Sequence, residues 1–493
     1  MSEQTTLSAR LRFLAVAGVG FFLDGYLNIV IGLVVPMIGY IYFKENKGSV
    51  PTIKGDEIKG ALSLGMIFGQ LCFGLFGDAL GRRKVYGKEL LFTSFGTLMV
   101  ILLPWKGLSR TGVVTWIAVW RVVTGVGIGG DYPMSASLSA EKSPIGSRAI
   151  QVLSVFSCIG LGAFTSSIVY LVLLSAFKHP IEKNIKHLEW VWRLLLGLAI
   201  IPAMSSLYAR FKMRETEPYK KFVATDTALI EGNSRGLKEQ FKEFNTYFRQ
   251  WKHAKVLFAV SASWFLFDIA YYGINLNQSV ILSKIGYGKG ATAYETLHKT
   301  AVGNIIVQIA GYLPGYYVGM FLPDLIGRKR QQFWLCLVAA LLYAVWAGVT
   351  KHASTGGLMT IFALSQFVLN AGPNCTTFLL PVEVFPTRVR ATAHGVAAAS
   401  GKVGAVLTSF AFGSITDKIG LDGTLGLLSG IMALVSLVTL LIPETKGRSI
   451  EDIEEEVLYG QRLVGGEDLS GKDSPRFPGQ IEKLSEKEED IER

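Results

Sequence analysis

Several ionisable residues lie inside apolar stretches of the sequence. Asp24 stands in GFFLDGYLNIVIG, Asp131 in GVGIGGDYPMS, Asp268 in SWFLFDIAYYG and Lys402 in AASGKVGAV, while Glu89 opens an apolar run in YGKELL. A carboxylate at the centre of a bilayer costs roughly 2.5–3.5 kcal/mol on insertion scales, so each needs a reason to be there. A buried carboxyl can stay protonated and later release its proton, and a buried lysine can compensate an anion. Any one of them alone is equally well explained as half of a structural ion pair, but four at comparable depth favour a lined polar cavity.

The elements that must hold these residues are apolar segments long enough to cross a membrane. A helix needs about 20 residues to span the hydrocarbon. The first run is too long for a cleaved signal peptide, so we expect it to be retained. Scanning at this length predicts about twelve spans, near residues 11–43, 59–80, 88–104, 113–140, 149–177, 189–209, 256–280, 299–322, 332–350, 357–384, 394–415 and 424–443.

Composition agrees with a lipid solvent. Half of the 493 residues are hydrophobic and 18% are charged, with a mean hydropathy of +0.37. The net charge of +11 does not indicate a nucleic-acid partner, because most Lys and Arg residues flank apolar segments. The four cysteines lie in apolar stretches without paired spacing, so neither disulfides nor a metal site is expected. No nucleophile–base pair, phosphate loop or metal-ligand cluster appears, so we expect neither an enzyme nor a cofactor.

Two loops repeat each other in the two halves of the chain. GDALGRRK follows the second span and PDLIGRKR follows the eighth, and Asp78 and Asp324 are 324 − 78 = 246 residues apart. A tight glycine turn then places Arg82 and Arg328 near acidic helix ends. Each loop alone is also explained as a basic turn that only sets orientation, but two copies at matching positions favour a gating latch that breaks and re-forms.

The repeat predicts the domain organisation. AEKSPIGSR and VEVFPTRVR also match, with Glu141 and Arg148 separated from Glu383 and Arg390 by 242 residues. We therefore expect two pseudo-symmetric six-helix bundles, with a site at mid-membrane between them. The predicted parts are an N-terminal bundle (1–209), a central cytoplasmic loop (210–255), a C-terminal bundle (256–449) and a disordered cytoplasmic tail (450–493). The majority of basic loops places both termini in the cytoplasm.

Longer stretches resemble a known family. GIGGDYPMSASLSAE, SWFLFDIAYYGINLNQSVIL, NAGPNCTTFLLPVEVFPTRVRATAHG, AASGKVGAV and PETKGRSIEDIE are similar, in order, to signatures of the phosphate:proton symporters of the major facilitator superfamily, of the fungal inorganic phosphate transporter and glycerophosphodiester permease type. The resemblance implies the major facilitator fold, an all-α membrane protein. It also implies a proton route through Asp24, Glu89 and Asp131. The implied substrate pocket comprises Tyr132, Trp264, Asp268, Tyr272, Asn374 and Lys402.

The residue types suit this implied pocket. Tyrosine hydroxyls, an indole N–H and an amide donate hydrogen bonds to phosphate oxygens, and Lys402 supplies the compensating cation. Asp268 beside a phosphate would release it on ionising. From the residues alone, Trp264 and Tyr272 are better explained as an aromatic packing stripe.

Two positions depart from the phosphate members of this family. Leu27 stands where they commonly carry a second acidic residue, and Ile159 stands where they commonly carry a glutamine. The stretch DGYLN looks like the glycerophosphodiester permeases, whereas DYP and the Trp264–Asp268–Tyr272 set look like the inorganic-phosphate branch. The two signals favour different substrates.

The sequence therefore predicts a symporter that imports inorganic phosphate, or a phosphate ester, with protons by alternating access. A permease for glycerophosphocholine or glycerophosphoinositol is the alternative, and sugar transport ranks third. A phosphate-sensing receptor is the alternative from a different class. The expected partners are a small phosphate-containing anion, protons and the lipid bilayer, with one copy of the chain sufficient. The plasma membrane is the location that the resemblance implies.

Overall fold

The computed structural model describes residues 7–46, 48–143, 145–213, 215–223, 236–448 and 452, and the described residues up to 448 belong to one compact unit. Their regular structure is helical throughout. The predicted tail at 450–493 lies outside the described residues except for Asp452, as do residues 224–235 of the predicted central loop.

The first half of the chain forms helices that follow the predicted spans. They are α1 (Leu7–Ile29), α2 (Ile31–Tyr42), α3 (Thr52–Leu80), α4 (Arg82–Val85), α5 (Lys88–Ile101), α6 (Arg110–Lys142), α7 (Arg148–Phe156), α8 (Cys158–Ala176), α9 (Lys178–Lys183), α10 (Leu188–Gly197) and α11 (Ile200–Phe211). The predicted boundary at residue 209 falls inside α11, so that Arg210 is part of a buried helix end and not of a loop.

Two short helices precede the second half. They are α12 (Glu217–Phe222) and α14 (Leu237–Phe248). The second half comprises α15 (Trp251–Asn275), α16 (Gln278–Lys284), α17 (Ala293–Val307), the π-helical turn η5 (Gln308–Tyr312), α18 (Leu313–Ile326), α19 (Arg328–Val349), α20 (Thr355–Ala371), α21 (Pro373–Val384) and α22 (Arg390–Thr439).

Nine helical stretches in the described ranges are long and apolar enough to cross a membrane. The other predicted spans are also helical but differ in length or continuity. The helix α5 has only 14 residues, and the tenth predicted span is broken at Gly372 between α20 and α21. The 50-residue α22 covers the last two spans, which are separated by the left-handed backbone of Gly420. Each of the twelve predicted spans therefore corresponds to helical structure.

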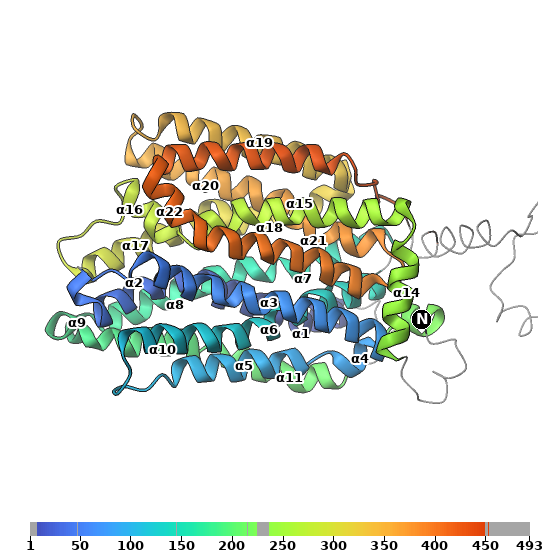
Figure 1. Cartoon of the computed structure of the whole chain (residues 1–493), viewed down its shortest axis with the longest axis horizontal. Coiled ribbons are helices and arrows are strands. Elements are labelled where there is room, and N and C mark those ends of the chain that lie inside the picture. The colour runs from blue at the N-terminus through green and yellow to red at the C-terminus, as the bar shows by residue number, and fades with distance from the viewer. Residues whose placement is uncertain are drawn as a thin grey trace, which may run out of the picture. The chain divides into compact units, whose positions relative to one another are not determined.

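The long helices lie side by side with roughly parallel axes, and α14 crosses their ends near α4 (Figure 1). Contacts between the two halves run mainly along α3 and α22, with further contacts between α8 and α17. Glycines allow the close approach of α3 and α22: a Cβ on Gly395 would lie 2.3 Å from the carbonyl oxygen of Gln70. The two halves therefore meet along helix faces on which a cavity can form.

Candidate functional site

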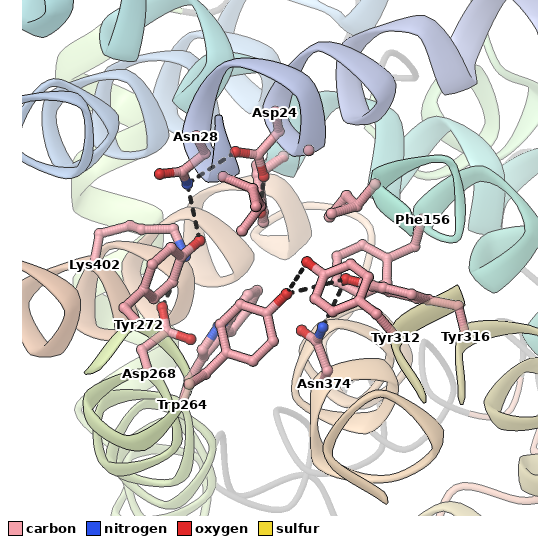
Figure 2. A pocket seen from close by; sticks show the side chains of 15 residues that line it. Asp24, Asn28, Phe156, Trp264, Asp268, Tyr272, Tyr312, Tyr316, Asn374 and Lys402 are labelled. Atoms are coloured by element: carbon pink, nitrogen blue, oxygen red, sulfur yellow. Dashed lines mark hydrogen bonds and ion pairs between the residues drawn. The ribbon is translucent and has the colours of Figure 1, made fainter. Parts of the chain in front are cut away.

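A cavity lies between the two halves at the middle of the long helices. Its lining comes from α1, α6, α7 and α8 of the first half and from α15, η5, α18, α21 and α22 of the second. Figure 2 shows these side chains converging from both sides. The structure brings together all six residues predicted to bind substrate and one residue of the predicted proton route, namely Tyr132, Trp264, Asp268, Tyr272, Asn374, Lys402 and Asp24.

One end of the cavity holds its charged groups, and we call it the charged end. Lys402 Nζ donates to Asp268 Oδ2 at 2.7 Å, and both side chains are buried. The same ammonium lies 4.5 Å from the ring centroid of Tyr272 and 5.4 Å from that of Tyr132, where aromatic faces stabilise a cation. The pair can form because α22 approaches α15 at Gly401, whose Cβ would lie 2.5 Å from the Trp264 ring.

Asp24 completes the charged end from the first half of the chain. Its Oδ2 accepts a hydrogen bond from the Tyr132 hydroxyl at 2.5 Å, and its Oδ1 accepts one from Asn28 Nδ2 at 3.2 Å. Asn28 Nδ2 also lies 3.3 Å from the Tyr272 hydroxyl, which belongs to the second half. Asp24 and Asn28 occupy the same face of α1 because they are one helical turn apart. Asp24 is thus connected to both halves.

The charges at this end do not balance when every group is ionised. Lys402 contributes one positive charge, whereas Asp24 and Asp268 contribute two negative ones. An anion entering the cavity then meets a net negative charge, and one proton on a carboxyl removes it. The cavity leaves only about 10 Å³ for the centre of a water molecule, which is space for about one water. Binding of phosphate therefore requires a wider state than the one described.

The other two residues of the predicted proton route lie outside the cavity and contact each other through a shared arginine. Arg210 Nη1 donates to Glu89 Oε1 at 2.6 Å and also to Asp131 Oδ1. The Cζ atom of the same guanidinium lies 4.4 Å from the ring centroid of Tyr86. Asp131 Oδ2 has no hydrogen-bond partner in the described part of the chain, and it lies against Gly20, one turn from Asp24 on α1. The cluster therefore lies next to the charged end but separate from it.

The first repeated loop joins the two halves. Asp78 on α3 accepts hydrogen bonds from the backbone N–H groups of Ala391 and Thr392, at 3.2 and 2.7 Å, and from the Thr392 hydroxyl at 2.6 Å. These groups open α22, so the carboxylate caps a helix of the opposite half. Arg82 bonds Asp78 at 2.6 Å and Glu141 at 3.0 Å. Burial opposes the charge on Arg82, but Glu141 and Asp78 outweigh it and raise the pKa of the guanidinium, which stays charged.

The second repeated loop makes its bonds inside its own half. Arg328 pairs with Asp324 at 2.9 Å and donates from Nε and Nη2 to the two oxygens of Glu383, at 2.9 and 3.1 Å. Its backbone N–H donates to Glu444. Within the described residues, no bond from Asp324 reaches α7, the counterpart of the capped helix, and Asp324 Oδ2 has no partner.

Sequence reasoning missed several residues that the structure places at these sites. The sequence pattern predicts a loop at Arg210 because this residue begins a polar stretch. A further repeat, Glu215–Thr216 against Glu444–Thr445, was also missed: Glu215 accepts from the N–H of Arg83 as Glu444 does from that of Lys329. The dipeptide Glu-Thr, which follows both the sixth and the twelfth span, could have indicated this repeat. Three tyrosines that line the cavity were missed as well, namely Tyr271, Tyr312 and Tyr316.

The model of the family described as sugar (and other) transporters matches residues 13–457 of this chain. A Schizosaccharomyces pombe protein assigned as an inorganic phosphate transporter is 40% identical, over 91% of this chain and 89% of the relative. The repressible high-affinity phosphate permease of Neurospora crassa is 35% identical, over 94% of this chain and 88% of the relative. The chain belongs to the phosphate:proton symporter family of the major facilitator superfamily. Its family consists of membrane transporters, and the sequence-based assignment is confirmed.

Solved structures agree on the fold. The Escherichia coli proton:xylose symporter XylE superimposes with a TM-score of 0.67, covering 91% of this chain and 99% of the symporter, at 17% identity. The prediction of an all-α, multi-pass membrane protein with the major facilitator fold is confirmed. No group of three or more metal-ligating side chains occurs among the residues that the structure describes.

Proposed function

We propose that this protein imports inorganic phosphate together with protons by alternating access between its two halves. The observation that carries the proposal is the charged end of the cavity, where Lys402 is balanced by Asp268 and Asp24 adds one further carboxylate. Relatives named as phosphate transporters and permeases, 33–40% identical over most of the chain, support the choice of anion.

Proton coupling follows from the charge count at this end. With Asp24 protonated, Lys402 and Asp268 neutralise each other, and an incoming phosphate meets no net negative charge. Phosphate then competes with Asp268 for Lys402, while the hydroxyls of Tyr132 and Tyr272 donate to its oxygens. Deprotonation of Asp24 restores the repulsion and expels the anion. Substrate and proton thus favour each other's binding, as symport requires.

The two carboxyls outside the cavity complete the proposed route. Asp131 and Glu89 share one Arg210 Nη1, and Asp131 Oδ2 faces Gly20, in the turn of α1 that precedes Asp24. We assign this cluster the exchange of the proton between Asp24 and the cytoplasmic side. The proposed orientation has both termini in the cytoplasm, and the proposed location is the plasma membrane.

Uptake of labelled phosphate into proteoliposomes tests the proposal. With an acidic outside, the wild-type protein should concentrate phosphate inside and acidify the lumen. Asp24→Asn should abolish accumulation but retain exchange of phosphate across the membrane, because exchange needs no net proton movement. Asp422→Asn is the matched control: this carboxylate pairs with exposed Lys351 at 2.7 Å, away from the cavity, and uptake should be unchanged.

Two results would contradict the proposal. Binding of phosphate without any flux by the wild-type protein would indicate a receptor. If Asp24→Asn still concentrated phosphate against its gradient and acidified the lumen, Asp24 would not be the coupling group.

A further inference from the structure

A groove lies on the lateral surface of the first half, between the C-terminal end of α5 and α10, and we call it the lateral groove. It encloses about 540 Å³, and its lining comprises residues 101–105, Trp190, Arg193, Leu194, Gly197 and Leu198. Figure 1 shows the two helices side by side at the edge of the bundle. A volume of this size is typical of a site for a small molecule.

The walls of the lateral groove continue as exposed apolar stripes on both sides. Residues three and four positions apart lie on one face of a helix. Because the chain is a membrane transporter, such stripes face acyl chains, and the occupant of the groove comes from the lipid. The stripe that follows α5 consists of Leu91, Phe95, Leu98 and Leu102, and the stripe that follows α10 and α11 consists of Trp190, Leu194, Leu198 and Ile201.

Arg193 is the charged residue among those that line the groove, and its side chain is more than nine-tenths buried. Its Nη1 donates to the carbonyl oxygens of Ile101 and Leu103, at 2.6 and 2.7 Å, and so caps the C-terminal end of α5. Its Nε donates to Glu189 Oε2 at 2.9 Å. These bonds leave Nη2 without a partner in the described part of the chain. A buried donor that stays unpaired is costly, so an oxygen acceptor on a ligand would be favoured.

Two tryptophans form the mouth of the groove. The ring centroids of Trp105 and Trp190 lie 5.1 Å apart with an angle of 50° between the rings, so the two rings form a corner. Trp105 also covers the guanidinium of Arg193, whose Cζ lies 4.3 Å from its ring centroid. Both indoles remain about half exposed, at 54% and 49%. Tryptophan is common at the ends of membrane spans, but an interfacial position does not explain a buried arginine beneath the ring.

The corresponding place in the second half holds a different pair of residues. The offset of 246 between the repeated loops aligns Trp105 with Lys351, and the offset of the Glu-Thr repeat, 444 − 215 = 229, aligns Arg193 with Asp422. Lys351 and Asp422 bond each other at 2.7 Å, and neither side chain is buried. The fold therefore does not require a buried arginine beneath an indole at this place.

We propose that the lateral groove binds one choline phospholipid of the surrounding bilayer. The phosphate accepts a hydrogen bond from Arg193 Nη2, the trimethylammonium group lies in the corner of Trp105 and Trp190, and an acyl chain lies between the two apolar stripes. Aromatic faces attract quaternary ammonium groups, and the indole of tryptophan does so most strongly. Arg193 and Glu189 contribute one charge of each sign, which suits a zwitterionic headgroup better than an anionic one.

Binding requires the movement of one side chain. Nη2 of Arg193 is covered in the described state, and the Trp105 ring lies over the guanidinium. Because this ring is half exposed and Trp105 lies outside both α5 and α6, it can turn outward and admit the phosphate. The lipid is held at the side of the first half and is not transported, so this inference does not depend on the proposed function.

Native mass spectrometry of the full-length protein with defined lipids tests the site. The probes are dioleoyl phosphatidylcholine, dioleoyl phosphatidylethanolamine, whose nitrogen carries hydrogens in place of methyl groups, and dioleoyl trimethylammonium propane, which lacks the phosphate. The wild-type protein should retain one molecule of phosphatidylcholine and prefer it at least about fivefold over each of the other two lipids. A primary ammonium is strongly hydrated and fits the aromatic corner less well, and a lipid without phosphate leaves Nη2 unpaired.

Substitution of the two tryptophans separates the parts of the site. Trp105→Leu/Trp190→Leu should lower the preference for phosphatidylcholine over phosphatidylethanolamine to below about twofold, since leucine keeps an apolar contact but offers no aromatic face. The preference over the lipid without phosphate should remain, because Arg193 is unchanged. The matched control replaces Trp251 and Trp334, which are exposed and do not line the groove. Trp251→Leu/Trp334→Leu should keep both wild-type preferences.

Three results would overturn the site. Equal retention of all three lipids by the wild-type protein would show that only bulk bilayer lipid contacts the groove. A preference for phosphatidylcholine over phosphatidylethanolamine that survives in Trp105→Leu/Trp190→Leu would place the headgroup elsewhere. Equal retention of phosphatidylcholine and the lipid without phosphate would show that Arg193 does not hold the phosphate. Since phosphate uptake is not measured, none of these results bears on the proposed function.

Discussion

The two repeated loops have nearly the same sequence and the same backbone but different connections. Gly81 and Gly327 both turn the chain with positive φ, 96° and 92°, and Arg82 and Arg328 both bond an acidic residue one turn earlier. The first loop nevertheless caps α22 of the opposite half, whereas the bonds of the second loop stay inside its own half among the residues that the structure describes. A shared motif thus fixes the local turn, while the helix facing it determines whether the loop connects the halves.

The facing helices differ at the position whose side chain bonds Asp78. The repeat offset of 242 aligns Thr392 with Ile150, which has no hydroxyl to offer Asp324. Asp78 is completely buried, whereas the Asp324 side chain is 30% exposed. The described state is therefore closed at the first loop by buried, charge-assisted hydrogen bonds, and opening on that side must break them.

The largest difference in phosphate uptake is expected between substitutions of Asp78 and of Asp324. Asp78→Asn removes the charge that caps α22, and one of its two terminal atoms becomes a donor facing backbone donors. Phosphate uptake per folded protein should fall by about 30-fold or more, ~2 kcal/mol. Asp324→Asn is the matched control and should change uptake less than about threefold. Equal losses in both variants would show that the two loops are equivalent in the cycle.

The next largest effects are expected at Glu141 and Glu383, where one substitution should mainly slow uptake and the other should mainly lower the melting temperature. Glu141 Oε1 accepts from Arg82 and from Arg390 of the opposite half, at 3.0 and 3.2 Å. Glu141→Gln should slow uptake about tenfold, because the bridge between the halves is weakened. Glu383→Gln breaks pairing with Arg328 inside one half, so it should lower the melting temperature more and uptake less. The reverse ranking in uptake and melting experiments would contradict this assignment.

The smallest effects concern the hydroxyl that distinguishes the facing helices. Thr392→Val removes one bond to Asp78 but keeps the backbone N–H, so uptake should fall only about threefold. Ile150→Thr offers a hydroxyl at the aligned position near the second loop, where Asp324 Oδ2 lacks a partner. It should raise the melting temperature slightly. If Ile150→Thr leaves it unchanged while Thr392→Val is harmful, the two facing helices differ by more than this hydroxyl.

Much of the fold was predictable because lipid imposes a simple rule on sequence. About 20 apolar residues per span and a repeated loop were enough to locate the helices and the halves. The cavity residues Asp24, Asp268 and Lys402 were predictable because an ionisable residue in an apolar run is conspicuous.

The remaining features depend on three-dimensional neighbours. Arg210 follows an apolar run and precedes a polar one, so its burial against Glu89 is visible only once α11 packs beside α5. Tyr271, Tyr312 and Tyr316 are indistinguishable in sequence from aromatic packing residues. The difference between the two loops involves single residues such as Ile150. The sequence alone does not indicate that this residue occupies the position that corresponds to Thr392 on the capped helix.

The cap on α22 also determines which mutations the closed state can withstand. The donors that Asp78 meets at Ala391 and Thr392 are mainly backbone N–H groups, which every residue except proline possesses. These two donors of the contact belong to the backbone, so most substitutions at these positions leave them in place. The other side depends on one carboxylate. Over generations, position 391 could therefore drift without loss of this contact, whereas position 78 would be constrained by its carboxylate and position 392 by its hydroxyl.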